Sequence, residues 1–454
     1  MKKLALSLAI AAALAACGGS GDSSTSNTTT PPADTSTPPV ANNPTPVAGT
    51  ETGILSDAQV AGVTYVTSSG VAGVTDAEGK YNFNPGDTVK FTIGAAVLGE
   101  VPAKGLLTPI DLAAGDSTKL TNLLVVMQSL DADGDPRNGI SIPEAAAKAM
   151  PTVDFTAPTS TLTASIKTAM AAGGIQGEVK TEDKAKEHFA EQATVLLSKN
   201  IWVQLRKDSA GRDLPAMLMR MNPDGEYLFG EIDQRDDSGQ SGIEYGKVKV
   251  HGFDQNGFDI RGLSQVEFGE TIDTNGEWGL SHMQAGEYFT IDDTSFKVGV
   301  PAGDTNEEPA VFAKIENVPF GIAGVWVLEH DDDATNAAPI KMTTLAFLRS
   351  GYMMVLDPVG GASDECGDPS NSGSLAPPKP GLELGVFNYG ENKKFVRRAA
   401  ALVDTNGCVG MWGDSDHNQD TEYTLSFSDD GNRVTFTGTV NGELDSFTLI
   451  RVSR

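Results

Sequence analysis

Hydrophobic and polar residues alternate in short runs along residues 62–94, GVTYVTSSGVAGVTDAEGKYNFNPGDTVKFTIG. β-Branched and aromatic residues gather at Val63–Val66, Lys80–Phe83 and Val89–Ile93, and turn-forming residues separate these runs. Such runs fit half-buried strands, whose side chains point alternately to the two faces of a sheet. The pattern predicts a small β module over residues 51–110.

The hydrophobic spacing becomes helical between residues 111 and 200. After a predicted N-cap at Ser117, apolar residues recur every three or four positions at Leu120, Leu123, Leu124, Met127 and Leu130. A second run follows a predicted cap at Thr181, with its apolar face at Ala185, Phe189, Ala193, Leu196 and Leu197. These runs predict a helical segment in which Pro143 opens a further short helix and residues 131–138 form a loop.

From residue 201 onward, strand-like runs recur about every ten residues, with Asn-Gly and Asp-Gly turns between them. The second half of this region repeats the first. The corresponding landmarks, in chain order, are Trp202 and Trp326, DGEYLFG and SGYMMVL, Glu244 and Glu383, Asp273 and Asp404, and Phe312 and Phe447. Their common order predicts two similar antiparallel domains, residues 201–320 and 321–454.

A meander of this length holds roughly eight strands, which close most economically as an up-and-down barrel; a flatter sandwich is the alternative. GVW, Gly324–Trp326, resembles the Gly-x-Trp opening of lipocalins, although Asn200 replaces the glycine in the first copy. VAGVTYVTSSGVAGVTDAEGKYNF resembles the immunoglobulin-like and prealbumin-like modules of bacterial surface proteins, which implies a spacer or adaptor role. The predicted fold class is mainly β: an Ig-like module, a helical segment and two tandem lipocalin-like barrels.

The chain begins with two lysines and an apolar run that ends in LAAC, Leu14–Cys17. The run is typical of a secretory signal peptide and is too short to span a bilayer. LAAC resembles the lipobox of bacterial lipoproteins, which implies loss of residues 1–16, lipidation of Cys17 and, with Gly18 next, an outer-membrane address. Residues 17–50 are nearly all small, polar or proline, which predicts a disordered tether reaching on the order of 30 Å.

The charge of the chain limits the classes of partner that it can bind, and its cysteine content bears on the compartment in which it folds. With 33 Lys and Arg against 61 Asp and Glu, the formal net charge is −28, which argues against nucleic acid and anionic lipid as partners. Once Cys17 is lipidated, the remaining cysteines are Cys366 and Cys408, in a compartment that permits disulfides. We therefore expect one disulfide between them.

The stretch SLDADGDPRNGISIP, residues 129–143, offers candidate metal ligands: Asp131, Asp133, Asp135 and Asn138. The spacing matches the first three acidic positions of an EF-hand loop, but Pro136 replaces its glycine and Ile142 its glutamate. All-oxygen ligands favour calcium over zinc or copper. We expect a structural calcium site here; a chain of aspartate-based turns is the alternative.

No nucleophile elbow or zinc-ligand spacing occurs in the sequence, and its five histidines are scattered. Each copy does contain two carboxylates that could act together in glycoside hydrolysis. The candidate pairs are Glu244 with Asp273 and Glu383 with Asp404. The alternative is that the glutamate caps local structure while DTNG forms a tight turn, with Asn275 and Asn406 left-handed. Duplicated scaffolding is commoner than duplicated active sites, so we predict a protein that is not an enzyme.

The predicted layout combines a lipid anchor, a tether, a spacer module and two β-domains. It resembles bilobed host-factor-binding or adhesin-like surface lipoproteins of proteobacteria, which implies an extracellular protein or glycan partner. The sequence thus predicts a cell-surface lipoprotein of the outer membrane with a non-enzymatic binding or adhesion role. One alternative is a carrier whose barrels enclose a small apolar ligand. A carboxylate-pair hydrolase is the third.

Overall fold

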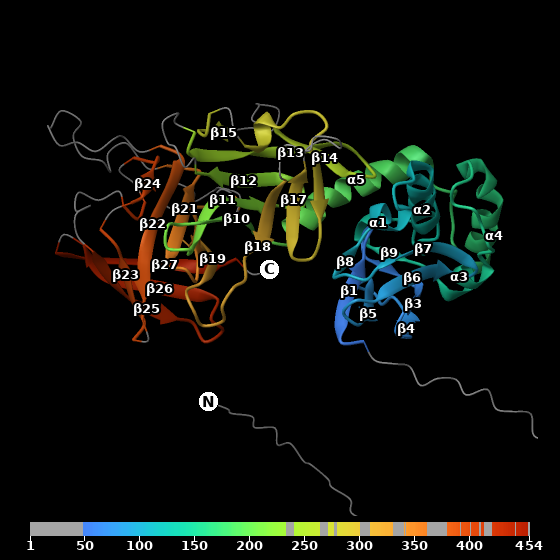
Figure 1. Cartoon of the computed structure of the whole chain (residues 1–454), viewed down its shortest axis with the longest axis horizontal. Coiled ribbons are helices and arrows are strands. Elements are labelled where there is room, and N and C mark those ends of the chain that lie inside the picture. Colours follow the sequence, from blue (N-terminus) through green and yellow to red (C-terminus); the bar gives the residue numbers. More distant parts are fainter. Residues whose placement is uncertain are drawn as a thin grey trace, which may run out of the picture. The chain divides into compact units, whose positions relative to one another are not determined.

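The structure of the chain is a computed structural model, shown in Figure 1. It describes residues 49–232, 240–263, 271–276, 279–299, 309–329, 340, 342–360, 379–390, 392–399, 401–407, 410–412, 420–440 and 442–452. The chain from Pro46 onward is one compact unit. Along this unit a small β module, a helical segment and two β-barrels follow one another.

Two small sheets form the N-terminal module. One consists of β5 (Lys80–Phe83), β1 (Glu51–Leu55) and β8 (Leu106–Leu107), and the other of β4 (Ala72–Val74), β3 (Thr64–Thr67), β6 (Thr88–Ile93) and β7 (Ala96–Pro102). The three strands predicted from alternation are β3, β5 and β6. Tyr65, Tyr81 and Phe91 face each other from the two sheets, and the rings of Tyr81 and Phe91 have centroids 5.1 Å apart. The aromatic positions of the alternating pattern therefore form the core of the module.

Five α-helices follow: α1 (Pro109–Ala113), α2 (Ser117–Ser129), α3 (Glu144–Ala149), α4 (Thr163–Gly173) and α5 (Glu182–Ser198). Thr181 caps α5 as predicted, because its hydroxyl accepts a hydrogen bond from the backbone N–H of Lys184. The cap predicted for α2 is wrong by one residue. Asp116, not Ser117, accepts from the N–H of Lys119 at 2.8 Å. Aspartate and serine are comparable N-caps, so two neighbouring candidates cannot be separated by residue type.

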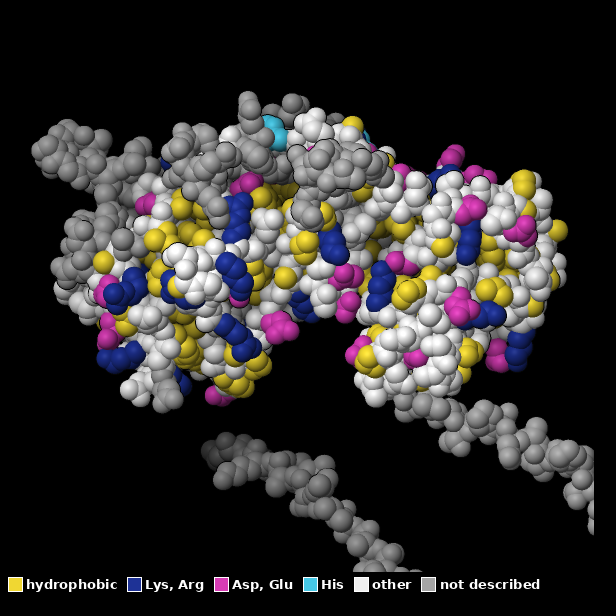
Figure 2. All heavy atoms as spheres, viewed as in Figure 1, with side chains coloured by type: hydrophobic (Ala, Val, Ile, Leu, Met, Phe, Trp, Pro, Cys, Tyr) yellow, Lys and Arg dark blue, Asp and Glu magenta, His cyan; other side chains and the backbone are white. Residues whose placement is uncertain are grey.

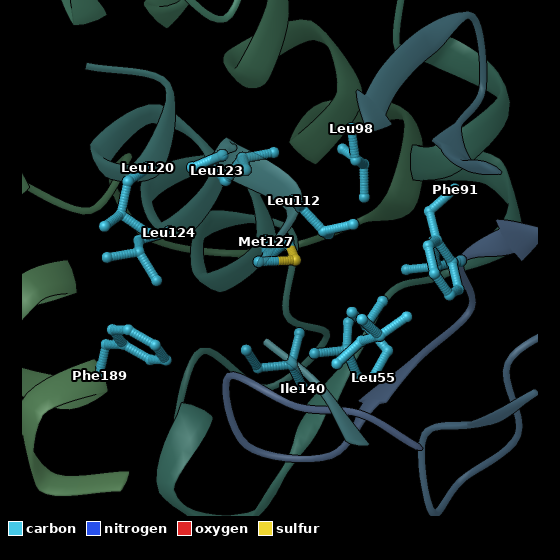
Figure 3. Packing of buried hydrophobic residues seen from close by; sticks show 14 of the residues in the cluster. Leu55, Phe91, Leu98, Leu112, Leu120, Leu123, Leu124, Met127, Ile140 and Phe189 are labelled. Carbon is cyan, nitrogen blue, oxygen red and sulfur yellow. The ribbon is translucent and has the colours of Figure 1, made fainter. Parts of the chain in front are cut away.

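The β module and the helical segment share one hydrophobic core. Figure 3 shows Leu55 of the module, Met127 of α2 and Phe189 of α5 within the same cluster. In addition, β2 (Val60–Ala61) pairs in parallel with β9 (Ile140–Ser141), the strand that follows the aspartate-rich loop. The loop is thus attached to the module on one side and to α2 on the other.

Eight antiparallel strands close the first barrel. Their order around the ring is β12, β11, β10, β18, β17, β16, β14 and β13, and pairing of β12 with β13 closes it, while β15 adds to β13. The bounds are β10 (Trp202–Lys207), β11 (Asp213–Met221), β12 (Glu226–Glu231), β13 (Gly242–Asp254), β14 (Gly257–Leu263), β15 (Ile272–Asp273), β16 (Tyr288–Ile291), β17 (Ser295–Gly299) and β18 (Ala310–Lys314). The order is that of a meander.

The second barrel repeats this ring strand for strand, in the order β21, β20, β19, β27, β26, β25, β23 and β22, with β24 added to β22. The bounds are β19 (Gly324–Leu328), β20 (Thr344–Phe347), β21 (Tyr352–Asp357), β22 (Gly381–Tyr389), β23 (Lys394–Arg397), β24 (Val403–Asp404), β25 (Thr421–Phe427), β26 (Arg433–Val440) and β27 (Glu443–Arg451). The prediction of two tandem up-and-down barrels is confirmed, and the flatter sandwich is wrong.

The strand registers correct one of the predicted landmark pairs. In each barrel the first strand pairs with the last: Trp202 with Lys314, and Trp326 with Arg451. Phe312 lies two residues before Lys314, and Leu449 lies two residues before Arg451. Phe312 is therefore equivalent to Leu449 and not to Phe447. The predicted match is wrong by two residues because it aligned two phenylalanines, whereas strand pairing determines which positions are equivalent.

The outer walls of the two barrels pack against each other through one hydrophobic cluster that contains residues from both. Gly230 lies against Leu356, and a Cβ atom at Gly230 would stand 2.2 Å from Leu356 Cδ2, so any side chain there would displace the leucine. At the edge of the contact, the Tyr352 hydroxyl donates to Asp208 Oδ2 at 2.7 Å and accepts from Arg212 Nη2 at 2.8 Å. The barrels are therefore joined by apolar packing with a polar border.

Candidate functional site

One glutamate of each repeat is completely buried in its barrel. In the first barrel, Glu244 on β13 accepts hydrogen bonds from the Leu280 N–H at 3.0 Å, the Ser281 hydroxyl at 2.6 Å and the Tyr227 hydroxyl at 3.2 Å. Leu280 and Ser281 follow the DTNG turn in the chain, so the carboxylate ties that loop to the barrel wall. Burial raises the pKa of Glu244.

The equivalent Glu383 on β22 does the same in the second barrel. Its carboxylate accepts from the backbone N–H groups of Met411 at 2.8 Å and Trp412 at 2.9 Å. The Trp412 ring lies directly over Gly385, where a Cβ atom would stand 2.0 Å from the indole. Burial raises the pKa of Glu383 to about 8, against these two hydrogen bonds, which favour the charged form.

The structure brings each predicted carboxylate pair together. Glu244 stands opposite Asp273 on β15, and Glu383 stands opposite Asp404 on β24. Both aspartates are exposed at the surface, whereas both glutamates have no exposed surface. Because the glutamate oxygens already accept hydrogen bonds from the loop, this geometry gives them the role of a structural cap.

The DTNG turn differs from the prediction in which residue adopts the left-handed conformation. Gly276 and Gly407 have φ of 75° and 86°, and the preceding asparagines do not have positive φ. Glycine lacks a Cβ atom and adopts this conformation at no steric cost. Asn275 and Asn406 are instead fully buried, and their side-chain amides have no hydrogen-bond partner among the described residues.

A possible metal-ligand group appears only in the first barrel among the described residues. The ligand atoms of Glu244, Asp273 and His282 all lie within 4.8 Å of one another, and His282 Nε2 is 3.3 Å from Asp273 Oδ2. No spacing in the sequence joins His282 to the pair, because the contact depends on how the loop folds back. Since Glu244 is occupied by the loop donors, only Asp273 and His282 are available, and a zinc site needs at least three protein ligands.

The exposed part of the aspartate-rich loop forms successive aspartate-based turns. Asp133 accepts from the Asp135 N–H and from Asn138 Nδ2, both at 2.9 Å. Asp135 forms an ion pair with Arg137. These hydrogen bonds correspond to the alternative reading of the sequence pattern, in which the side chains stabilise turns.

Asp131, at the start of this loop, is different because it is buried. Its Oδ1 accepts from the Ser141 N–H at 2.9 Å, and its Oδ2 has no hydrogen-bond partner among the described residues. Burial, and next the nearby carboxylate of Asp133, raise the pKa of Asp131. A cation at Oδ2 would offset both effects, so the calcium site stays a prediction for this loop.

A buried polar cluster that sequence reasoning missed joins the β module to the helices. Gln128 Nε2 on α2 donates to Asp57 Oδ2 at 2.9 Å and to the carbonyl of Ala185 at 3.0 Å, and His188 Nε2 on α5 lies 3.9 Å from Asp57 Oδ1. Burial raises the pKa of Asp57 to about 8 and lowers that of His188 to about 4. Both groups are therefore neutral at mildly acidic pH, which suits a contact between core elements.

The second barrel has a pocket of about 580 Å³ at one end. Leu345, Val355 and Leu449 from the barrel interior line its floor, and Phe447 lines its wall. Asp445 stands at the mouth, where its carboxylate accepts a hydrogen bond of 2.9 Å from the Tyr423 hydroxyl. The pocket combines an apolar interior with an acidic and aromatic mouth.

A larger cleft, of about 1060 Å³, lies between α5 and the hairpin of β13 and β14. Its lining contains the basic residues Arg137, Lys186, Lys249 and His251 and the acidic residues Glu187, Glu191, Asp224 and Asp254. Because both charge signs are interspersed, the lining does not favour one class of ligand.

Three predicted residues lie outside the described part of the chain. They are Cys17, Cys366 and Cys408. Lipidation of Cys17 and the disulfide between the other two remain predictions. Among the described helices, none is long and apolar enough to cross a membrane.

Comparison with known proteins adds no relative. No protein-family model matches the chain, and no curated protein is similar to it.

Proposed function

We propose that this chain is a lipid-anchored protein of the outer membrane that is exposed at the cell surface and binds a partner without transforming it. The observation that supports binding without catalysis is the use of both buried glutamates, Glu244 and Glu383, as loop caps in equivalent barrels. Because the two glutamates have the same capping role in both barrels, they fit a duplicated structural feature rather than a duplicated active site. The hydrolase alternative loses the nucleophile or acid that it requires.

The anchor and the charge support the same proposal. The LAAC motif predicts a lipid anchor and residues 17–50 predict a tether that would hold the folded part away from a membrane, and the net charge of −28 disfavours nucleic acid. On the face shown in Figure 2, basic side chains are interspersed with acidic ones and do not form a single basic patch. An extracellular protein or glycan is the partner class that fits this surface.

Protease treatment of intact cells tests the location, and metabolic labelling with a palmitate analogue tests the anchor. We expect the protein to be labelled and to be degraded without cell lysis, and Cys17→Ala to lose the label. A pull-down with the unlipidated chain then searches for the partner. Full resistance to the protease in intact cells, or equal labelling of the variant, would contradict the proposal.

We further propose that the aspartate-rich loop binds calcium in a structural role. The unpartnered, buried Oδ2 of Asp131 beside Asp133 supports it. A chelator should lower the melting temperature of the full chain, and Asp133→Ala should remove that difference. Asp154→Ala is the matched control, because Asp154 makes the same kind of turn with Thr156 elsewhere in the helical segment. A melting temperature that does not respond to chelator means that the aspartates only form turns.

A second candidate function, a carrier of a small apolar ligand, is favoured by one observation. The pocket in the second barrel has a volume within the range of about 300–1,000 Å³ that is usual for small-molecule sites. Binding of such a ligand is compatible with a surface lipoprotein and needs no catalytic group.

A further inference from the structure

We propose that the second barrel, and not the first, binds a small amphiphile with an apolar body and a cationic head of the alkylammonium type. The inference rests on the proposed function only in that the protein binds and does not transform. It assigns one barrel, one end of that barrel and one class of ligand.

The bottom of the barrel is closed by an arginine stacked on a tryptophan. The Arg451 guanidinium lies 4.0 Å from the centre of the Trp326 ring, and both side chains are buried. Arg451 Nη2 donates to the Gly321 carbonyl at 2.9 Å and Nε donates to the Gly431 carbonyl at 3.2 Å. Arg451, held by these partners, occupies the barrel interior at this end, so the pocket lined by Leu449 and Asp445 opens toward the other end.

Two residues at the floor of the pocket are smaller than their counterparts in the first barrel. Register makes Val355 equivalent to Phe229 and Leu449 equivalent to Phe312. In the first barrel Phe312 also stacks on Phe296 with ring centroids 4.3 Å apart, so aromatic rings occupy the equivalent space. Two phenylalanines are thus replaced by smaller aliphatic residues where the second barrel has its pocket.

Three described strands of the second barrel are longer than their counterparts in the first. Strands β25, β26 and β27 have 7, 8 and 9 residues, whereas the equivalent β16, β17 and β18 have 4, 5 and 5. The additional residues of β27 include Glu443 and Asp445, which line the pocket. The longer strands therefore deepen the pocket toward its mouth.

The mouth carries negative charge and aromatic faces. Glu443 and Asp445 stand there, and the rings of Tyr423 and Phe447 are in contact with centroids 5.6 Å apart. Lys, Arg and His are absent from the described residues that line the pocket. Carboxylates beside aromatic rings attract ammonium groups by charge and by the ring quadrupole. A carboxylate or sulfate head would find no positive partner in this lining.

Calorimetric titration of the full chain carrying Cys17→Ala, which removes the lipid, tests the proposal. The probes are decyltrimethylammonium, decyl sulfate and decyl maltoside, all below the concentrations at which they form micelles. We expect one saturable site for the ammonium, with affinity about tenfold or more above that for the sulfate. Equal affinity for the two charged probes would overturn the ligand class, and absence of saturable binding would overturn the site.

Variants separate the interior from the mouth. Val355→Phe introduces the residue of the first barrel and should abolish binding of every probe, while Val311→Phe, at an exposed position of the first barrel, should leave binding unchanged. Asp445→Asn should weaken the ammonium about tenfold and leave decyl maltoside unchanged. Circular dichroism checks that each variant is folded, and Phe447→Ala, at a partly exposed position, replaces Val355→Phe if that variant does not fold.

Binding retained in folded Val355→Phe, or an Asp445→Asn variant that weakens all probes equally, would overturn the proposal. Neither result bears on the surface location or on a macromolecular partner, which protease treatment and the pull-down test separately. The two proposals can therefore fail independently.

Discussion

The two barrels share a ring order and a buried glutamate, yet their interiors differ. Both rings close through eight strands in the same sequence order, and Glu244 and Glu383 cap the same loop. The two barrels differ at their ends. The second barrel has Arg451 stacked on Trp326, whereas the first has an exposed lysine, Lys314, at the equivalent position.

This comparison separates what a duplicated barrel must keep from what it can change. The capping glutamate holds a loop against the wall, and its loss would leave buried N–H groups without acceptors. Interior positions near an end need only be apolar, so a change from phenylalanine to valine or leucine is compatible with closure. Such changes alter the space inside without altering the ring.

The largest expected effect comes from removing the tryptophan of each barrel. Trp202 and Trp326 are fully buried, and each donates its indole N–H to a backbone carbonyl, at 2.8 and 2.7 Å. Truncation to alanine should lower the free energy of unfolding by about 3–5 kcal/mol in either barrel. Trp326→Ala should lower the free energy of unfolding more than Trp202→Ala does, because it also removes the ring on which Arg451 stacks. Urea unfolding of both variants measures this, and equal losses would show that the plug adds no stability.

The predicted disulfide sharpens the comparison, since Cys366 and Cys408 both belong to the second copy. A link across 42 positions (408 − 366) would stabilise that barrel by about 4 kcal/mol in the chain-entropy model. Reduction should therefore lower the unfolding midpoint of the second barrel and leave the first unchanged. Thiol titration of the unreduced, unfolded protein provides the check. Two free thiols beyond Cys17 would refute the link.

The buried glutamates should make stability depend on pH. The pKa of Glu383 is raised to about 8 in the folded chain from an ordinary value of 4.5, so the folded state binds the proton more tightly. This contribution is fully present below about pH 4.5 and is lost as the pH rises toward 8. Glu383→Gln should remove that slope.

Denaturant unfolding of Glu383→Gln and of the unchanged chain at pH 5 and pH 9 measures the effect. At pH 5 the variant should be less stable by about 1–3 kcal/mol, because the amide NH₂ cannot accept from a backbone N–H. At pH 9 the deficit should shrink, since the unchanged chain then buries a charge. Glu244→Gln should change the stability of the first barrel in the same direction, because burial also raises the pKa of Glu244. If the variant is less stable than the unchanged chain by the same amount at both pH values, the raised pKa of Glu383 is not the cause of the pH dependence.

The smallest effect concerns the contact between the barrels. Tyr352→Phe removes the hydroxyl that bridges Asp208 and Arg212 and should cost about 1 kcal/mol. Tyr389→Phe, on another strand of the same barrel, serves as the control. Thermal unfolding should show the two transitions moving apart in Tyr352→Phe, and unchanged coupling would mean that apolar packing alone joins the barrels.

The sequence by itself determined the duplication and many of the strands and helices, and it favoured closed barrels over a sandwich, but it predicted neither α1 nor α4. Alternation at Lys80–Phe83, helical spacing after Thr181 and ordered landmarks such as Glu244 and Glu383 are local properties of the chain, because side-chain direction follows from backbone geometry. A run of strands that each pair with the next leaves only the first and last to meet, so ring closure could also be predicted. The carboxylate pairs were visible for the same reason.

Only the tertiary structure decided how these parts are used. That Asp57 meets Gln128 and that Gly230 lies against Leu356 are contacts between positions far apart in the sequence. That Val355 takes the place of Phe229 follows only from the strand registers of the two barrels. Residue type does not reveal which apolar surfaces will pack together, since any closely packed arrangement removes similar areas from water. For the same reason, the glutamates could be identified as a pair from the sequence, but their capping role required the folded loop.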